Sequence, residues 1–253
     1  MKKLATRIAK ETGKILLENF GRKPKVLESM RHDLRIKMDR IAEQNIIRMI
    51  EDSGMECDIL SEECGELKKG CSEYRWIIDP LDGTVNYAYG IPHFCVSIAL
   101  EKDGEIILGV VNDPYKKELF FAEKGKGAIM NNRRIRVSRR SKLKDAIIVT
   151  YTGHKDKNIR RYLRNYERLV FSVKKIRITG TAALDLCYVA CGRFDGCITL
   201  NARPWDNAAG AFIIQEAGGR VGTLDGNAWN PFVDDIIATN GLVHEKLSRL
   251  LRW

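Results

Sequence analysis

The stretch Trp76-Ile77-Ile78-Asp79-Pro80-Leu81-Asp82-Gly83-Thr84 decides how this chain is interpreted. Its apolar run predicts a strand, and two carboxylates follow three residues apart, with a turn-forming Gly and a hydroxyl directly behind them. Carboxylates at a strand end suit hard divalent cations, which prefer oxygen ligands. The same DPxDG pattern is also an ordinary β-turn sequence, so a metal site and a structural turn are both open at this point.

Other acids stand at the ends of predicted elements, namely Asp39, Glu62, Glu63 and Asp206. One or two Mg²⁺ ions held by such acids could polarise a phosphate and lower the pKa of a bound water. Taken singly, Glu62-Glu63 could follow a helix cap and Asp206 could be an N-cap. The chain contains no GxxxxGK[ST], GxSxG or GxGxxG motif, and metal-assisted phosphate chemistry therefore has no competing signature.

Composition indicates a globular chain of 253 residues, with 44% hydrophobic and 30% charged residues. No run of about 18 apolar residues is present, so we expect no membrane-spanning helix. The first 20 residues start with two lysines, but charged residues interrupt their apolar positions. This pattern is typical of an amphipathic helix rather than a secretory signal, and we expect a cytoplasmic protein.

The net charge of +10 could favour nucleic acid, a membrane surface or anionic substrates. The charge is mostly dispersed, with local clusters at 133–140 and 160–161, so we favour a Lys/Arg-rich surface and expect no nucleic-acid partner. Seven cysteines form no CxxC pair, and their odd number argues against a disulfide framework. Buried thiols are expected, with a redox-controlled disulfide as the alternative, and the four histidines lack zinc-ligand spacing.

Periodicity predicts two helices first, then a run of strands separated by turns, then alternating helices and strands. The expected helices cover 4–20, 39–52, 158–169, 182–191, 206–216 and 244–251. The expected strands cover 57–60, 74–78, 94–100, 105–111, 118–122, 146–150, 174–179, 195–200 and 236–239. This order, without a low-complexity linker or a repeat, predicts a layered α/β architecture in one unit over 1–253.

The combined motifs resemble the inositol monophosphatase family, within the magnesium-dependent, lithium-sensitive sugar phosphatases. The matching segments are Asp33-Leu34 with Asp39, Glu62-Glu63, Trp76 to Asn86, Gly180-Thr181-Ala182-Ala183, Trp205-Asp206-Asn207-Ala208-Ala209-Gly210 and Glu216-Ala217-Gly218-Gly219. The likeness runs from the first predicted helix to the end of the chain. It implies a layered α-β-α-β-α sandwich of the inositol monophosphatase/fructose-1,6-bisphosphatase type, and a homodimer.

The resemblance also implies two or three Mg²⁺ ions per site. Their ligands would be Glu62, Asp79, the Leu81 carbonyl, Asp82 and Asp206. The catalytic residues would be Asp39, Thr84 and Glu62, with Thr84 and Asp39 activating the attacking water. The substrate-binding residues would be Asp82, Gly83, Thr84, Gly180, Thr181, Ala182, Arg203 and Asp206.

The implied substrate is a small phosphorylated polyol or sugar, with inositol 1-phosphate as the first expectation. Many animal-type members carry an inositol-binding Glu seven residues before the second-signature Asp, and Thr199 stands there. Fructose 1,6-bisphosphate is therefore the alternative, since Arg203 and Arg177 could serve a second phosphate or could be plain surface charges. A 3′(2′),5′-bisphosphate nucleotidase and an RNA- or transcription-complex-associated factor, as some bacterial relatives are, remain as further alternatives.

Overall fold

In the computed structural model, which describes residues 1–29, 34–67, 72–151 and 156–251, the larger sheet is built around β5. Its eight described strands have the order β10-β9-β8-β7-β6-β5-β3-β4. They are β3 (Asp58–Ser61), β4 (Gly65–Leu67), β5 (Tyr74–Asp82), β6 (Cys95–Lys102), β7 (Glu105–Asp113), β8 (Glu118–Glu123), β9 (Gly127–Met130) and β10 (Arg133–Arg134). All neighbours pair antiparallel except β3 and β5, which run parallel.

The second sheet is smaller and mixed, with the order β12-β11-β13-β15-β14. Its strands are β11 (Ile147–Tyr151), β12 (Lys175–Arg177), β13 (Gly196–Thr199), β14 (Arg220–Gly222) and β15 (Ile236–Thr239). A separate hairpin pairs β1 (Val26–Ser29) with β2 (Leu34–Ile36). Parallel pairs join β11 to β12 and to β13, whereas the pairs made by β15 are antiparallel.

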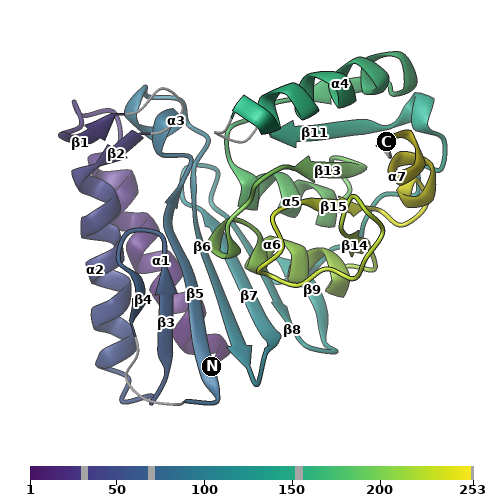
Figure 1. The fold of residues 1–253 in the computed structure, drawn as a ribbon. Coiled ribbons are helices and arrows are strands. Elements are labelled where there is room, and N and C mark those ends of the chain that lie inside the picture. Colours follow the sequence, from purple (N-terminus) through teal and green to yellow (C-terminus); the bar gives the residue numbers. More distant parts are fainter. Residues whose placement is uncertain (30–33, 68–71, 152–155, 252–253) are drawn as a thin grey trace.

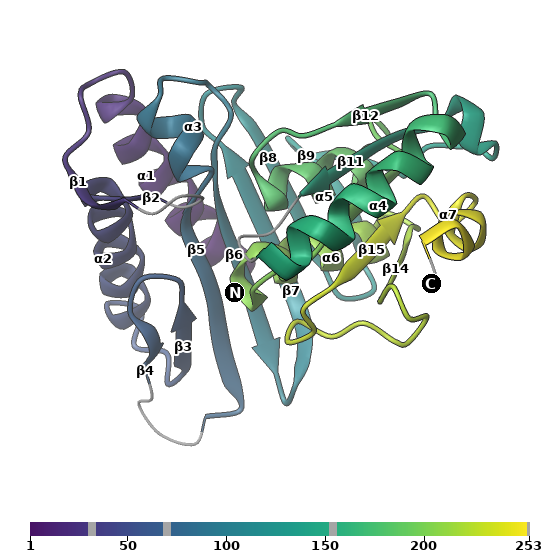
Figure 2. The same cartoon turned by 45° about the horizontal axis from the view of Figure 1, so that its top comes forward.

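Helices fill three layers around these sheets (Figure 1). The layers are α1 (Lys2–Asn19) with α2 (Lys37–Glu51) outside the larger sheet, α5 (Ala182–Ala190) with α6 (Pro204–Glu216) between the sheets, and α4 (Asp156–Ser172) with α7 (His244–Leu251) outside the smaller sheet. Figure 2 shows α4 and α7 lying over the smaller sheet from a second direction. The result is the expected α-β-α-β-α order.

Strand β5 is buried on both faces, which explains its unbroken apolar run. Ile77 packs in the core shared with α5 and α6, while Trp76 and Ile78 pack in the core shared with α1 and α2. Successive strand residues point to opposite faces, so one short run supplies both cores. Full burial of each such side chain contributes on the order of 2 kcal/mol.

The expected helices and strands are confirmed, with boundaries displaced by a few residues. The main additions are short elements: β1, β2, β4, β9, β10, β14, the helix α3 (Thr84–Ala88) and a 3₁₀ turn at Leu143–Asp145. Among the described helices, none combines the length and the apolar character needed to cross a membrane. Residues 31–33 of the expected loop, including Asp33, lie outside the described residues.

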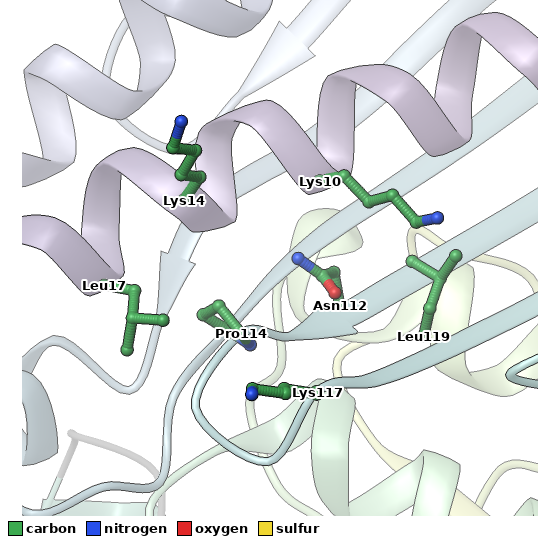
Figure 3. Close-up of a pocket in the computed structure, with 7 residues that line it drawn as sticks. All are labelled: Lys10, Lys14, Leu17, Asn112, Pro114, Lys117 and Leu119. Atoms are coloured by element: carbon green, nitrogen blue, oxygen red, sulfur yellow. The ribbon is translucent and has the colours of Figure 1, made fainter.

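A surface cavity of about 270 Å³ lies between α1 and the turn that joins β7 to β8 (Figure 3). Apolar side chains, which include Leu17 and Leu119, line it together with the lysines Lys10, Lys14 and Lys117. None of the acids selected from the sequence lines this cavity. The candidate site described next is therefore a separate feature.

Candidate active site

The Asp79-to-Asp82 segment is a bulged strand end, and the alternative of a β-turn is wrong. In the pairing with β6, Asp79 stands opposite Ser97 and Asp82 stands opposite Cys95, so three steps along β5 match two along β6. A bulge of this kind returns the second carboxylate to the face of the first. Ser97 donates to the Trp205 carbonyl at 3.4 Å, which identifies that face as the one toward α6.

Asp82 caps helix α5 from a distant part of the chain. Its carboxylate accepts the backbone N–H groups of Ala182 at 3.2 Å and Ala183 at 2.8 Å. Thr181, the local N-cap residue, makes no side-chain capping bond. Burial raises the pKa of Asp82 to about 6, although these N–H groups and the helix dipole favour its ionised form.

Thr84 and Asp39 form the expected pair. The Thr84 hydroxyl lies 3.1 Å from Asp39 Oδ1 and 3.0 Å from the Leu81 carbonyl oxygen. One hydroxyl proton serves only one of these acceptors at a time, and Thr84 Oγ1 keeps lone pairs that can accept from a water. Asp39 is the third residue of α2 and is fixed by the Ile36 N–H, which donates to its Oδ2 at 2.6 Å.

Asp206 is held in the same way on another helix. It is the third residue of α6, and its Oδ2 accepts the Arg203 N–H at 2.8 Å. The expected helix start at Asp206 is therefore wrong by two residues, because Pro204 occupies the first turn, where a missing N–H costs nothing. Asp39 and Asp206 therefore share one arrangement. Each is the third residue of its helix, and its carboxylate accepts the N–H of the residue that precedes the helix.

Glu62, which directly follows β3, forms a cluster of four acids with Asp79, Asp82 and Asp206. Its N–H donates to the Ile78 carbonyl at 3.3 Å. Its carboxyl group interacts directly with that of Asp79. Burial raises the pKa of Glu62 well above its usual range, and Asp206 raises it further. Burial, Glu62 and Asp82 raise the pKa of Asp79 in the same way.

These acids fit a divalent cation by their chemistry. They are oxygen donors whose raised pKa values report negative charge crowded in a poorly solvated place, and a cation would relieve that repulsion. The Leu81 carbonyl has a second lone pair besides the one facing Thr84. In this structure, no three His, Cys, Asp or Glu side chains of the described residues are arranged as a finished metal site.

Gly83 lies directly against the segment Gly180 to Ala182. Its φ of +94° is in the left-handed region, and a Cβ added there would approach Thr181 Cγ2 to 2.5 Å and the His93 carbonyl to 3.0 Å. The Asn86 amide holds the same junction by donating to the carbonyls of His93 and Thr179, each at 2.9 Å. The two expected substrate-binding segments are thus adjacent.

The residues expected to decide substrate specificity, Arg203, Arg177 and Thr199, lie outside the cluster of acids. Arg203 is exposed at the N-cap of α6, and Arg177 is exposed at the end of β12 with Nη1 donating to the Ile176 carbonyl at 3.0 Å. Thr199 is buried at the end of β13, where its hydroxyl lies 3.6 Å from Cys197 Sγ. A Thr hydroxyl at that position is much shorter than the Glu found in animal-type members.

The thiols match the expectation for most positions. The six described cysteines are not disulfide-bonded, and Cys57, Cys95, Cys187 and Cys197 are buried. Cys64 is exposed. Cys71 lies outside the described residues.

His93 and Thr179 join the site although the sequence reasoning did not select them. His93 Nε2 lies 2.9 Å from Thr181 Oγ1, and the Thr179 hydroxyl donates to Asp185 at 2.6 Å. Only the adjacency of Thr179 to the Gly180-Thr181 motif could have indicated its place, and no local signal marks His93.

Comparison with known proteins agrees with this geometry. The model of the inositol monophosphatase family matches residues 1–252. An inositol-1-monophosphatase of Rhizobium meliloti is 43% identical over 83% of this chain and 80% of its own length. A fructose-1,6-bisphosphatase/inositol-1-monophosphatase of Thermotoga maritima is 36% identical over 97% of this chain and 93% of its own. The Nus factor SuhB of Haemophilus influenzae is 35% identical over 99% and 95%.

The fold has a near match among solved structures. The extragenic suppressor protein suhB of Bartonella henselae superposes with a TM-score of 0.95 at 39% identity, covering 99% of this chain and 98% of the other. The chain therefore belongs to the inositol monophosphatase family, a family of metal-dependent phosphatases. Its relatives divide among inositol monophosphatases, dual-specificity sugar phosphatases and SuhB factors.

Proposed function

We propose that this chain is a Mg²⁺-dependent phosphomonoester hydrolase that acts on inositol 1-phosphate by attack of an activated water. The observation that carries the proposal is the gathering of four acids next to the Thr84–Asp39 pair. These acids are Glu62, Asp79, Asp82 and Asp206. Such a set offers oxygen ligands on one side and a polarised hydroxyl on the other.

Glu62, Asp79 and the Leu81 carbonyl would hold one ion, and Asp79, Asp82 and Asp206 would hold a second. A third ion would rest loosely on Glu62 and on waters. When bound, Mg²⁺ supplies Lewis acidity toward the phosphate, a lowered pKa for bound water and charge for the leaving oxygen. The crowding that raises the acids' pKa values supports this ligand assignment.

The protein's own groups would then position the reactants. Asp39, anchored by the Ile36 N–H, would accept a hydrogen bond from the Thr84 hydroxyl, and the Thr84 oxygen would in turn accept one from the attacking water. The backbone N–H groups of Gly83 and Thr84 would hold phosphate oxygens at the start of α3, where the helix begins. Gly180, Thr181 and Ala182 would lie against the substrate ring.

A dual specificity that includes fructose 1,6-bisphosphate is the second substrate assignment. The buried Thr199 leaves no carboxylate for inositol hydroxyls, and the Thermotoga relative bears both activities in its name. Arg203 and Arg177, both exposed, are the candidates for a second phosphate. Activity as a 3′(2′),5′-bisphosphate nucleotidase is a less favoured substrate assignment than either of these two.

Initial rates on these phosphates with Mg²⁺, with and without lithium, test the proposal. We expect magnesium-dependent release of phosphate, inhibition by lithium, and the highest kcat/KM on inositol 1-phosphate. A preference for fructose 1,6-bisphosphate that falls in R203Q or R177Q would support the dual assignment. Phosphate release that persists in EDTA would contradict the metal assignment.

A transcription-associated role is the second candidate function. It is favoured by the Nus factor SuhB relatives and by the net charge of +10. Lys/Arg contacts to an RNA backbone weaken steeply with salt. A salt titration of RNA binding decides this point, since no binding at low salt would remove the candidate.

We further propose that residues 1–253 act as one phosphatase unit, as a homodimer, in the cytoplasm. The family match across residues 1–252 supports the single unit. Light scattering across a concentration series would measure the mass of the assembly. A mass that stays at the 28.8 kDa of one chain would contradict the dimer.

A further inference from the structure

A line of polar contacts reaches the substrate-binding segment from the turn between β7 and β8. Asp113, fully buried, lies 3.0 Å from Lys116 Nζ. The same Nζ lies 3.1 Å from His93 Nδ1. On the other side of the ring, His93 Nε2 lies 2.9 Å from Thr181 Oγ1.

This line fixes the tautomer of His93. The Lys116 ammonium has donors only, so His93 Nδ1 must accept and the ring proton must sit on Nε2. Asp113 raises the pKa of Lys116 against the effect of burial and keeps the amine charged. Burial first, and then Lys116, lower the pKa of His93 to about 4, so the neutral ring persists at neutral pH. The Nε2–H therefore donates to Thr181.

The Thr181 hydroxyl is available for this contact because Asp82, rather than Thr181, caps the start of α5. A Thr at an N-cap normally accepts a backbone N–H of its own helix, whereas Asp82 accepts those of α5. The Thr181 methyl meanwhile lies against Gly83, and the His93 carbonyl is tied through Asn86 to Thr179. His93 thus contacts the same segment through its ring and its backbone.

We propose that His93 is a positioning residue: held by Lys116 as the Nε2–H tautomer, it fixes Thr181 and so sets the spacing between Gly83 and the segment from Gly180 to Ala182. The first of these adjacent segments is the one proposed to hold the phosphate and the second is the one proposed to contact the substrate ring, so His93 sets affinity without taking part in the bond-breaking step. This consequence for affinity rests on the proposed function, while the tautomer does not.

The first test compares His93→Phe with His93→Gln. Phe keeps the ring without a donor, and the Gln amide places an N–H near the former Nε2. Loss of one such hydrogen bond raises the KM for inositol 1-phosphate and the Kd for inorganic phosphate with Mg²⁺ by about 3- to 10-fold. The kcat stays within about 2-fold, as for a loss of uniform binding. His93→Gln recovers most of the affinity, and thermal melting confirms that both variants fold.

The second test reads the tautomer directly from imidazole ¹⁵N chemical shifts. The wild type shows Nε2–H, and Lys116→Gln, whose amide can donate or accept, shows both tautomers. An Nδ1–H wild type overturns the proposal at any level of activity. An unchanged phosphate Kd in His93→Phe overturns it as well, as does equal loss in the Phe and Gln variants. If no phosphomonoester is hydrolysed, the proposed function fails, and the phosphate Kd still decides the role of His93.

Discussion

Gly83→Ala is expected to destabilise the fold through two separable effects. The first is the backbone, because an L-residue at φ +94° costs about 1–2 kcal/mol. The second is overlap, since the new Cβ would lie 2.5 Å from Thr181 Cγ2, where ordinary contacts begin at 3.4 Å. Relieving it requires a shift of about 1 Å in a packed site, which costs about 1–3 kcal/mol. The free energy of unfolding should therefore fall by about 2–5 kcal/mol.

Gly90 provides a matched control in the same chain. Its φ is +72°, and an added Cβ there would meet nothing within 4 Å. Gly90→Ala should therefore show the backbone cost alone, about 1–2 kcal/mol. The difference between the two variants isolates the overlap at Gly83.

Urea unfolding at neutral pH in EDTA measures both variants, and a double-mutant cycle with Thr181→Ser identifies the atom responsible. Ser removes Cγ2 and keeps the hydroxyl that accepts a hydrogen bond from the His93 Nε2–H. The cycle should therefore return a coupling energy of about 1–3 kcal/mol. Equal stability of Gly83→Ala and Gly90→Ala, or a coupling energy below about 0.5 kcal/mol, would refute the reasoning.

Three further perturbations test other parts of the site and fold. Asp79→Asn should lower kcat at least about 100-fold. The same change should raise the free energy of unfolding without metal, because it removes a buried charge that Glu62 repels. A lower free energy of unfolding in EDTA would contradict this. Thr84→Val should lower kcat by about 10²–10⁴-fold while Thr84→Ser keeps most of it, as measured by steady-state rates. His244 is buried with a pKa lowered to about 4 by burial and then by Arg220, so its unfolded form protonates near pH 6.5 and its folded form only near 4. The contribution of His244 to stability is thus fully present above pH 6.5 and falls by up to about 3 kcal/mol toward pH 4. His244→Asn should lack this contribution, so urea unfolding should show a smaller loss of stability over this pH range than in the wild type.

Local patterns were sufficient to predict that acids from several elements would come together. The apolar run before Asp79 and the acids at element ends are visible in the sequence, and they do meet around one place. Helix and strand periodicity predicted a layered α/β architecture, and the resemblance to the family supplied the order of its five layers. Helix starts were less well placed: Pro204 was a usable signal for the start of α6, and its weight was underestimated.

What the sequence could not predict depends on partners far along the chain. The bulge between Asp79 and Asp82 exists only in the register with β6, and the DPxDG letters suit a turn equally well. Short strands such as β4 and β14 are defined by their neighbours rather than by their own composition. The tautomer of His93 depends on Lys116, which a separate turn brings beside it.

The capping of α5 by Asp82 has a consequence for the order in which parts of the chain fold. During synthesis the strand bearing Asp82 leaves the ribosome about 100 residues before Ala183, whose N–H it later accepts. Until then the Asp82 carboxylate remains hydrated, because the N–H groups at the start of α5 that donate to it have not yet been synthesised. The acidic cluster therefore loses its water only when α5 and α6 pack against the larger sheet. Pulse-labelling hydrogen exchange should find the amides of Ala182 and Ala183 protected late, together with one another.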